Sequence, residues 1–103
     1  MSHREDINEQ HAALLGALAN AKRLQILKEI LDQETSVGDL ARKLGLSQSA
    51  LSQHLSRLRA LELVSTRRVA QTIYYTSRSI RVRKILATLA ELQTGARVFR
   101  AAG

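Results

Sequence analysis

The sequence of 103 residues is long enough for one domain with a modest core, and it contains no cysteine, which excludes disulfides, thiolate metal sites and cysteine catalysis. It also contains no run of ~18 apolar residues that could span a membrane, and its N-terminus is polar, so we expect a cytoplasmic protein. The net charge of +7 favours a polyanionic partner, nucleic acid before membrane.

The first part of the chain predicts two amphipathic helices. In the first, over residues 6–19, apolar residues share one side, and acidic residues occupy the first turn, which suits the positive end of a helix. Asn20 is a good N-cap for the second, over residues 21–33. The apolar stripe of this second helix consists of Leu24, Leu27, Ile30 and Leu31.

Residues 36–61 predict a helix-turn-helix. A short helix over Val37–Leu44 should end at Gly45, because glycine readily takes a positive φ. Ser47 can then cap a longer helix over Gln48–Leu61. Two helices joined by three or four residues that include a glycine are typical of this motif. Leucines at steps of three and four predict the buried side of the longer helix: Leu51, Leu55, Leu58 and Leu61.

The other side of this longer helix carries small polar residues. A recognition helix presents its N-terminal half to the major groove, where glutamine can pair with an adenine edge and short hydroxyls allow close approach. The candidate base-reading residues are Gln48, Ser49, Ser52 and Gln53. The candidate backbone contacts are Ser47, His54, Ser56, Arg57 and Arg59. An ordinary solvated helix face is the alternative, and His54 fits the edge of the core equally well.

Residues 63–77 break the helical period and predict a β-hairpin. Two short runs rich in Val, Thr, Ile and Tyr flank a tip at 69–71, although the tip lacks an Asn-Gly pair. Tyr74 and Tyr75 should point to opposite faces. A basic wing of this kind can follow the DNA backbone or reach the minor groove, and an ordinary exposed hairpin is the alternative. Its candidate DNA contacts are Arg67, Arg68 and Gln71.

The end of the chain predicts a last helix over residues 79–94. Ser79 can cap this helix, and Gly95 is expected to end it, which leaves residues 95–103 as a loose tail. Its apolar positions are Val82, Ile85, Leu86, Leu89 and Leu92.

The cations are concentrated in the middle of the chain. Residues 39–84 hold ten Lys and Arg against two acids, whereas residues 1–38 hold four against six. A segregated basic block is typical of nucleic-acid binding, and a generally soluble basic surface is the alternative.

Three segments within residues 18–77 resemble the ArsR/SmtB family of winged-helix repressors: "LANAKRLQILKEIL", "VGDLARKLGLSQSALSQHLSRLRALELVSTRR" and "QTIYYTS". The resemblance implies a homodimer, formed by the first and last helices, that binds an inverted-repeat operator in double-stranded promoter DNA. A domain this small could hardly bury all the leucines of those helices alone, although closure of a monomer core is the alternative. The candidate dimer-interface residues are Leu14, Leu15, Leu18, Ile85, Leu86, Leu89 and Leu92.

Many members of that family sense metals, and the sequence departs from the family pattern at both usual sites. Where one site has a Cys-x-Cys pair, this chain has Ser36 and Gly38. His3 and His11 could meet near a partner's helix, but two histidines are weak evidence for zinc, so we predict neither a metal site nor a cofactor. The ligand positions of the other site hold Ser79, Arg81, Leu92 and Gly95.

Together these patterns predict a mainly α fold with a small β-hairpin: a winged helix-turn-helix of five helices and a two-stranded wing. We expect a sequence-specific, DNA-binding repressor, and the pattern identifies no small-molecule inducer. A non-specific architectural DNA-binding protein and a winged helix used for protein assembly are the alternatives. The sequence contains no convincing nucleophile–base pair, carboxylate cluster or phosphate-binding glycine loop, so an enzyme is not expected.

Overall fold

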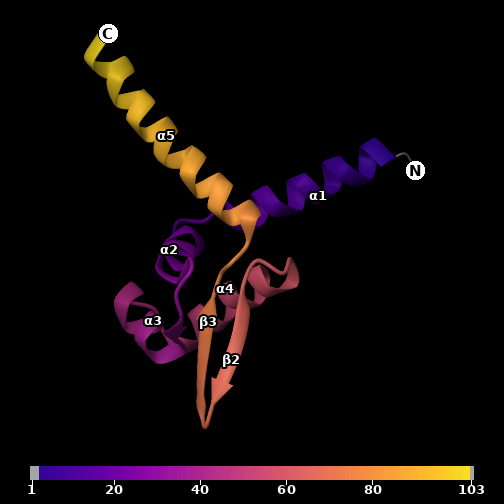
Figure 1. Ribbon diagram of the computed structural model, residues 1–103, viewed down its shortest axis with the longest axis vertical. Coiled ribbons are helices and arrows are strands. Elements are labelled where there is room, and N and C mark those ends of the chain that lie inside the picture. Colours follow the sequence, from indigo (N-terminus) through magenta and orange to yellow (C-terminus); the bar gives the residue numbers. More distant parts are fainter. Residues whose placement is uncertain (1–2, 103) are drawn as a thin grey trace.

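The computed structural model describes the backbone of residues 3–102 and the side chains of residues 6–94, with five helices and a three-stranded sheet (Figure 1). The predicted winged helix-turn-helix fold is confirmed. Within the described part, no helix is long and apolar enough to cross a bilayer. The elements in chain order are α1 (His3–Leu18), α2 (Ala21–Ile30), β1 (Thr35–Ser36), α3 (Val37–Leu44), α4 (Gln48–Ala60), β2 (Ser65–Val69), β3 (Thr72–Thr76) and α5 (Ile80–Ala102).

Polar side chains fix where four of the helices begin. The side-chain oxygens of Asn20, Ser36 and Ser47 accept hydrogen bonds from the backbone N–H three residues on, at 3.0, 3.2 and 3.1 Å. Ser79 accepts in the same way from Val82 at the start of α5. The first N–H groups of a helix have no partner inside it, so each cap stabilises its helix start.

One apolar core holds the helix-turn-helix together. Leu51, Leu55 and Leu58 of α4 are almost completely buried, which confirms the predicted stripe. The fourth predicted member, Leu61, is half-buried just beyond the end of α4. The fully buried residues that join them from α2 and α3 are Ile26, Leu27, Ile30 and Leu40.

The sheet contains one strand that the sequence analysis missed. β1 pairs antiparallel with β3, and the strand order is β1-β3-β2. A strand of two residues shows no alternation of apolar and polar positions, so no pattern could reveal it. The wing itself has the predicted form, with a tight turn in which Ala70 takes a φ of 54°. Tyr75 is buried and Tyr74 is half-exposed, as their alternation predicts.

Three predicted helix boundaries are wrong. α1 begins at His3, three residues before the predicted start. α2 ends at Ile30, because the chain turns at Asp32 and bonds to the segment after the wing. The carbonyl of Ile30 accepts from Ser77 N, and Asp32 N donates to Ser77 O, both at 2.9 Å. The predicted loose tail is also wrong, since α5 continues through Gly95 to Ala102. A glycine costs a helix only about 1 kcal/mol, which a long helix without proline tolerates.

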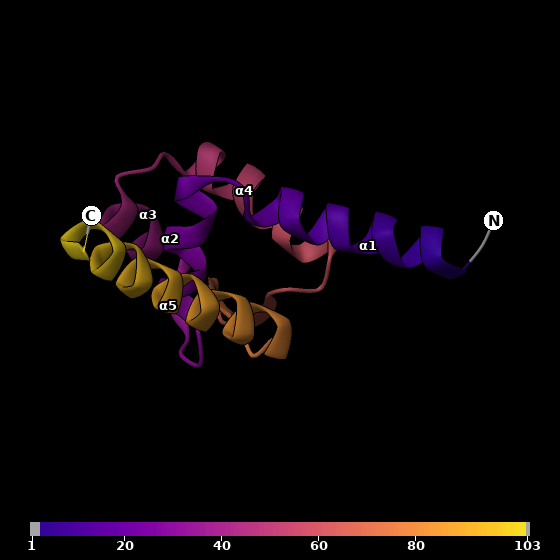
Figure 2. The same cartoon turned by 90° about the horizontal axis from the view of Figure 1, so that it is seen from above.

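α1 and α5 project from the body in diverging directions (Figures 1 and 2). Among the described side chains of α1 and α5, those buried in the core are Leu14, Ala17, Leu18 and Val82. Both helices therefore leave apolar side chains exposed. These exposed side chains are Ile7, Leu15, Ile80, Leu89 and Leu92.

We expect Leu51→Ala to lower the free energy of unfolding by roughly 2–5 kcal/mol, because it removes a fully buried side chain and leaves a cavity. Urea unfolding followed by circular dichroism measures the change. Ser52→Ala lies on the exposed side of the same helix and is the matched control, with an expected change within about 0.5 kcal/mol. Equal destabilisation by both substitutions would contradict the assignment of Leu51 to the core.

Candidate nucleic-acid interface

The polar side of α4 lies on the surface of the molecule. All of the predicted base-reading residues are exposed, while the leucines between them are buried. Ser47 and Ser56 are exposed too, and the Ser47 hydroxyl also accepts from Ala50 N as the cap of α4. The helix therefore presents a face of small hydroxyls and amides that can approach a ligand closely. The exposed base-reading candidates are Gln48, Ser49, Ser52 and Gln53.

Three arginines near this face carry charge that no described acid neutralises. Arg57 and Arg59 lie exposed in the last turn of α4, and Arg68 lies exposed in β2. Within residues 6–94, none of the three forms an ion pair. Other cations of the basic block do form pairs: Arg42 with Asp39, Lys43 with Glu29 and Arg83 with Asp32.

The two neighbouring arginines of the wing differ in their surroundings. Arg67 binds both carboxylate oxygens of Glu34, with Nε and Nη2 each 2.8 Å away. Its guanidinium also lies 5.5 Å from the centre of the Tyr74 ring. Arg68 has no such partner among the described side chains, and Gln71 is exposed at the wing tip.

Residues of α4 and of the wing together line two hollows on the surface. One, of about 510 Å³, is lined by Ser52, Ser56 and Arg59 of α4 with Tyr75 of β3. Another, of about 420 Å³, has Gln48 at the start of α4 and Gln71 at the wing tip among its lining residues. The fold thus gathers predicted contacts from α4 and the wing around shared concave surfaces.

Arg23, a buried cation of α2, connects three helices, and the sequence analysis did not single it out. Its guanidinium donates to the carbonyls of Gly16 and Ala17 at the end of α1, and it lies 3.4 Å from Nδ1 of His54 in α4. Helix ends leave carbonyls without partners, which a guanidinium can satisfy. The signal was present, because Arg23 lies three, four and seven positions before Ile26, Leu27 and Ile30 on the buried stripe.

His54 therefore lies at the edge of the core, the second of the two positions considered for it. Its half-buried ring faces Arg23. Burial lowers the pKa of His54, and the charges of Arg23 and Lys22 lower that pKa further. The neutral imidazole can accept a hydrogen bond through Nδ1 from Arg23.

The predicted dimer-interface residues divide into buried and exposed sets. Leu14 and Leu18 belong to the core of the single chain, and Ile85 and Leu86 are half-buried against it. Leu15, Leu89 and Leu92 remain 60%, 41% and 62% exposed. The monomer core therefore accounts for some of these residues, and other apolar side chains of α1 and α5 are left exposed.

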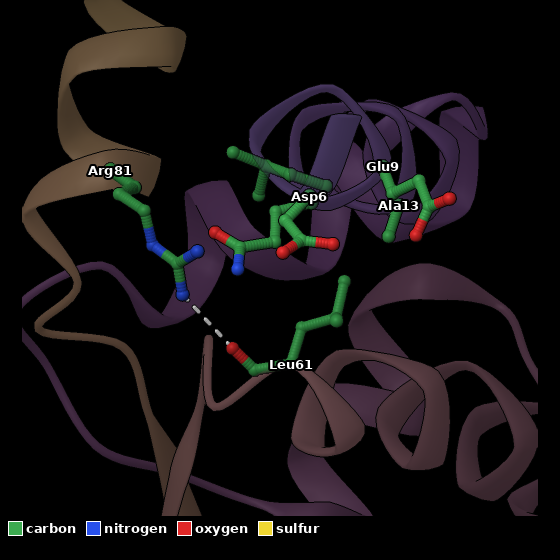
Figure 3. Close-up of a pocket in the computed structure, with 7 residues that line it drawn as sticks. Asp6, Glu9, Ala13, Leu61 and Arg81 are labelled. Atoms are coloured by element: carbon green, nitrogen blue, oxygen red, sulfur yellow. Dashed lines mark hydrogen bonds between the residues drawn. The ribbon is translucent and has the colours of Figure 1, made fainter. Parts of the chain in front are cut away.

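An open cavity of about 410 Å³ lies where α1 approaches the start of α5 (Figure 3). Asp6, Glu9 and Ala13 of α1 line it, opposite Arg81 of α5. Arg81 donates to the carbonyl of Leu61 at 3.0 Å, so its guanidinium is held at the end of α4.

The metal-ligand positions that the resemblance implies are occupied by Ser36 and Gly38, and by Ser79, Arg81, Leu92 and Gly95. Among the side chains that the structure describes, no three His, Cys, Asp or Glu residues are grouped as a metal site. His11 is exposed on α1, and the side chain of His3 lies outside the described residues.

Comparison with known proteins decides the family. Residues 20–66 match the family described as bacterial regulatory protein, arsR family. The chain is 48% identical to the transcriptional activator HlyU of Vibrio cholerae over 92 residues, which cover 89% of this chain and 85% of HlyU. The chain belongs to the ArsR family. The resemblance predicted from the sequence is thus confirmed.

Two further relatives extend the match. The nodulation protein NolR of Rhizobium meliloti is 62% identical over 81 residues, which cover 79% of this chain and 66% of NolR. The crystal structure of NolR from Sinorhizobium fredii superposes with a TM-score of 0.84 at 57% identity, covering 89% of this chain and 93% of that chain. This ArsR-family chain is a winged helix-turn-helix, DNA-binding transcriptional regulator, and its relatives are regulators rather than enzymes.

We expect the free energy of unfolding of this ArsR-family chain to fall as the pH is lowered through about 6.5. Unfolded His54 takes up a proton near its usual pKa, whereas burial and then the Arg23 and Lys22 charges lower the pKa in the folded chain. The unfolded state therefore binds more protons in this window, and the loss ends once the pH is below the lowered pKa. Urea unfolding at a series of pH values measures it.

His54→Gln removes the titrating group and should flatten this pH dependence. His11→Gln is the matched control, because His11 is exposed on α1, and it should leave the dependence in place. A wild-type stability that is constant across the window would show that His54 does not titrate differently on folding.

Proposed function

We propose that this chain is a sequence-specific transcriptional repressor that binds an inverted-repeat operator as a homodimer and blocks access of polymerase to the promoter. The observation that carries the proposal is the exposed, uncharged face of α4, held from behind by buried leucines. Amides and short hydroxyls on such a face can hydrogen-bond base edges in the major groove.

Base discrimination is assigned to Gln48, Ser49, Ser52 and Gln53. A glutamine amide can both donate to and accept from an adenine edge, and one such pair is worth ~1–3 kcal/mol against the wrong base. The serine hydroxyls donate or accept as the neighbouring base requires. Their position in the N-terminal half of α4 agrees with the way recognition helices enter the major groove.

Affinity is assigned mainly to phosphate contacts, which release counterions and do not depend on sequence. Arg57, Arg59 and Arg68 are the main candidates, because no described acid neutralises them. Ser47, Ser56 and Gln71 are exposed and can add hydrogen bonds to the backbone. The remaining two candidates, His54 and Arg67, already have partners within the chain.

The dimer is proposed from the apolar surface of α1 and α5. Leu15, Leu89 and Leu92 are exposed on helices that project from the body (Figure 1). A 29% identical relative from Mycobacterium bovis, described as a homodimeric winged helix-turn-helix DNA-binding domain, has a TM-score of 0.79 and supports the same assembly here. Two-fold symmetry would place the two α4 helices about one DNA turn apart, ~34–36 Å, on an inverted repeat.

We expect Gln53→Ala to relax sequence preference while non-specific binding persists. The test is a gel-shift competition between random DNA and a duplex that wild-type protein enriches from a random oligonucleotide pool. Preference for the enriched duplex should fall by roughly 5- to 150-fold, the equivalent of losing one bidentate base contact. In vitro transcription from a promoter carrying that duplex should fall when wild-type protein is added.

Gln25→Ala is the matched control, because Gln25 is exposed on α2, outside the proposed interface. A folded Gln53→Ala protein that loses specific and random binding equally would count against direct reading by Gln53. Enriched duplexes without an inverted repeat would count against the dimeric operator complex.

We expect Arg68→Ala to weaken binding to all sequences and to reduce the slope of log affinity against log salt by about one. Arg68 is exposed in the wing and unpaired among the described side chains, so its charge is available to a phosphate. Fluorescence anisotropy at several salt concentrations measures the slope. An unchanged slope would rule out a phosphate contact by Arg68.

A further inference from the structure

The wing carries two adjacent arginines whose side chains must point to opposite faces of the sheet. Arg67 pairs with Tyr74 across β2 and β3, and Arg68 pairs with Ile73. Successive residues of a strand alternate between faces, and directly paired residues share a face. Tyr75 shares the face of Ile73 and lines the hollow beside α4, so Arg68 lies on the α4 side and Arg67 on the outer face.

Arg67 is held on that outer face by two side chains, Glu34 and Tyr74. Its Nε and Nη2 each donate to one oxygen of Glu34 at 2.8 Å, a bidentate geometry that fixes direction as well as distance. The guanidinium also covers the Tyr74 ring at 5.5 Å from its centre. The hydrogen bond from Arg67 lowers the pKa of the Glu34 carboxyl, and the charges of Arg67 and Arg78 lower it further.

Glu34 comes from a different part of the fold. It immediately precedes β1, and Ser36 at the end of β1 is the N-cap of α3. The Glu34–Arg67 pair therefore spans the sheet from the segment that enters the helix-turn-helix to the far strand of the wing. β1 pairs with β3 at two positions, and the backbone bonds of Ile30 and Asp32 with Ser77 hold the base of the wing. The Glu34–Arg67 pair adds a contact nearer the wing tip, since Arg67 lies opposite Tyr74.

We propose that Glu34 is a positioning residue for DNA binding, which holds Arg67 across the outer face so that the wing carries Arg68 to the DNA backbone. The two arginines then have separate tasks, since Arg67 fixes the wing and Arg68 contacts phosphate. This inference rests on the proposed DNA-binding role of the wing and assigns to Glu34 a part in that role.

Charge repulsion alone predicts the opposite effect on DNA affinity when the charge of Glu34 is removed. A carboxylate beside a DNA-binding surface repels phosphate, so removing its charge should strengthen binding. If Glu34 positions the wing, removing its charge should weaken binding instead. The sign of the change therefore separates the two explanations.

The experiment measures the affinity of the full chain for the enriched duplex and for random duplex by fluorescence anisotropy. Glu34→Gln should weaken binding roughly two- to fivefold, the range expected for an exposed ion pair. Glu62→Gln is the matched control, because it removes the same charge from an exposed acid at the end of α4 and should not weaken binding. Thermal unfolding establishes that each variant is folded.

A charge swap and a salt series complete the test. The double variant Glu34→Arg, Arg67→Glu keeps the net charge and the pair, and it should recover most of the lost affinity. Arg67→Ala should weaken binding but leave the salt slope unchanged, whereas Arg68→Ala lowers the slope by about one. A merely structural ion pair would change stability without this contrast between neighbouring arginines.

Several results would overturn the inference. The inference fails if the Glu34→Gln variant binds DNA as tightly as wild type or more tightly. It also fails if the charge-swapped double variant recovers none of the lost affinity. A reduced salt slope in Arg67→Ala would make Arg67 a phosphate contact. If wild type does not prefer the enriched duplex, the sequence-specific function fails separately, and the ranking of variants on random duplex still tests the role of Glu34.

Discussion

The burial of three leucines along one side of α4 is the constraint on which the rest of the molecule depends. Leu51, Leu55 and Leu58 fix the rotation of this helix about its own axis, because turning it would expose all three. Each buried leucine is worth about 2 kcal/mol in apolar burial. The polar residues between them contribute little to that core, and their chemistry is therefore available for recognition.

Arg23 extends this constraint from α4 to α1. A buried guanidinium is costly unless its donors are satisfied, and here the end of α1 and the neutral ring of His54 accept them. The direction of α1 relative to α4 is therefore coupled to one side chain of α2. In a dimer built through α1 and α5, the same geometry would set the separation of the two reading helices.

The fold also determines where positive charge remains available. Acids from the first part of the chain pair with cations far along the sequence: Glu29 with Lys43, Asp32 with Arg83 and Glu34 with Arg67. Such exposed pairs add little stability. Their other consequence is electrostatic, because they neutralise the charges of Lys43, Arg67 and Arg83. Arg57, Arg59 and Arg68 carry no such pair among the described side chains, and all three belong to α4 or the wing.

The sequence alone determined the capped starts of α2, α3, α4 and α5, the buried stripe and exposed face of α4, the hairpin and the family resemblance, because caps and apolar periodicity are local signals, as at Ser47 and Leu51. It could not show that α2 stops at Ile30, since that end depends on hydrogen bonds to Ser77, forty-seven residues away. Nor could the sequence show that Arg67 forms an ion pair with Glu34 while Arg68 forms none among the described side chains, or that Arg23 contacts His54. Those distinctions arise from strand register and from contacts between distant segments, and only the tertiary structure brings such segments together.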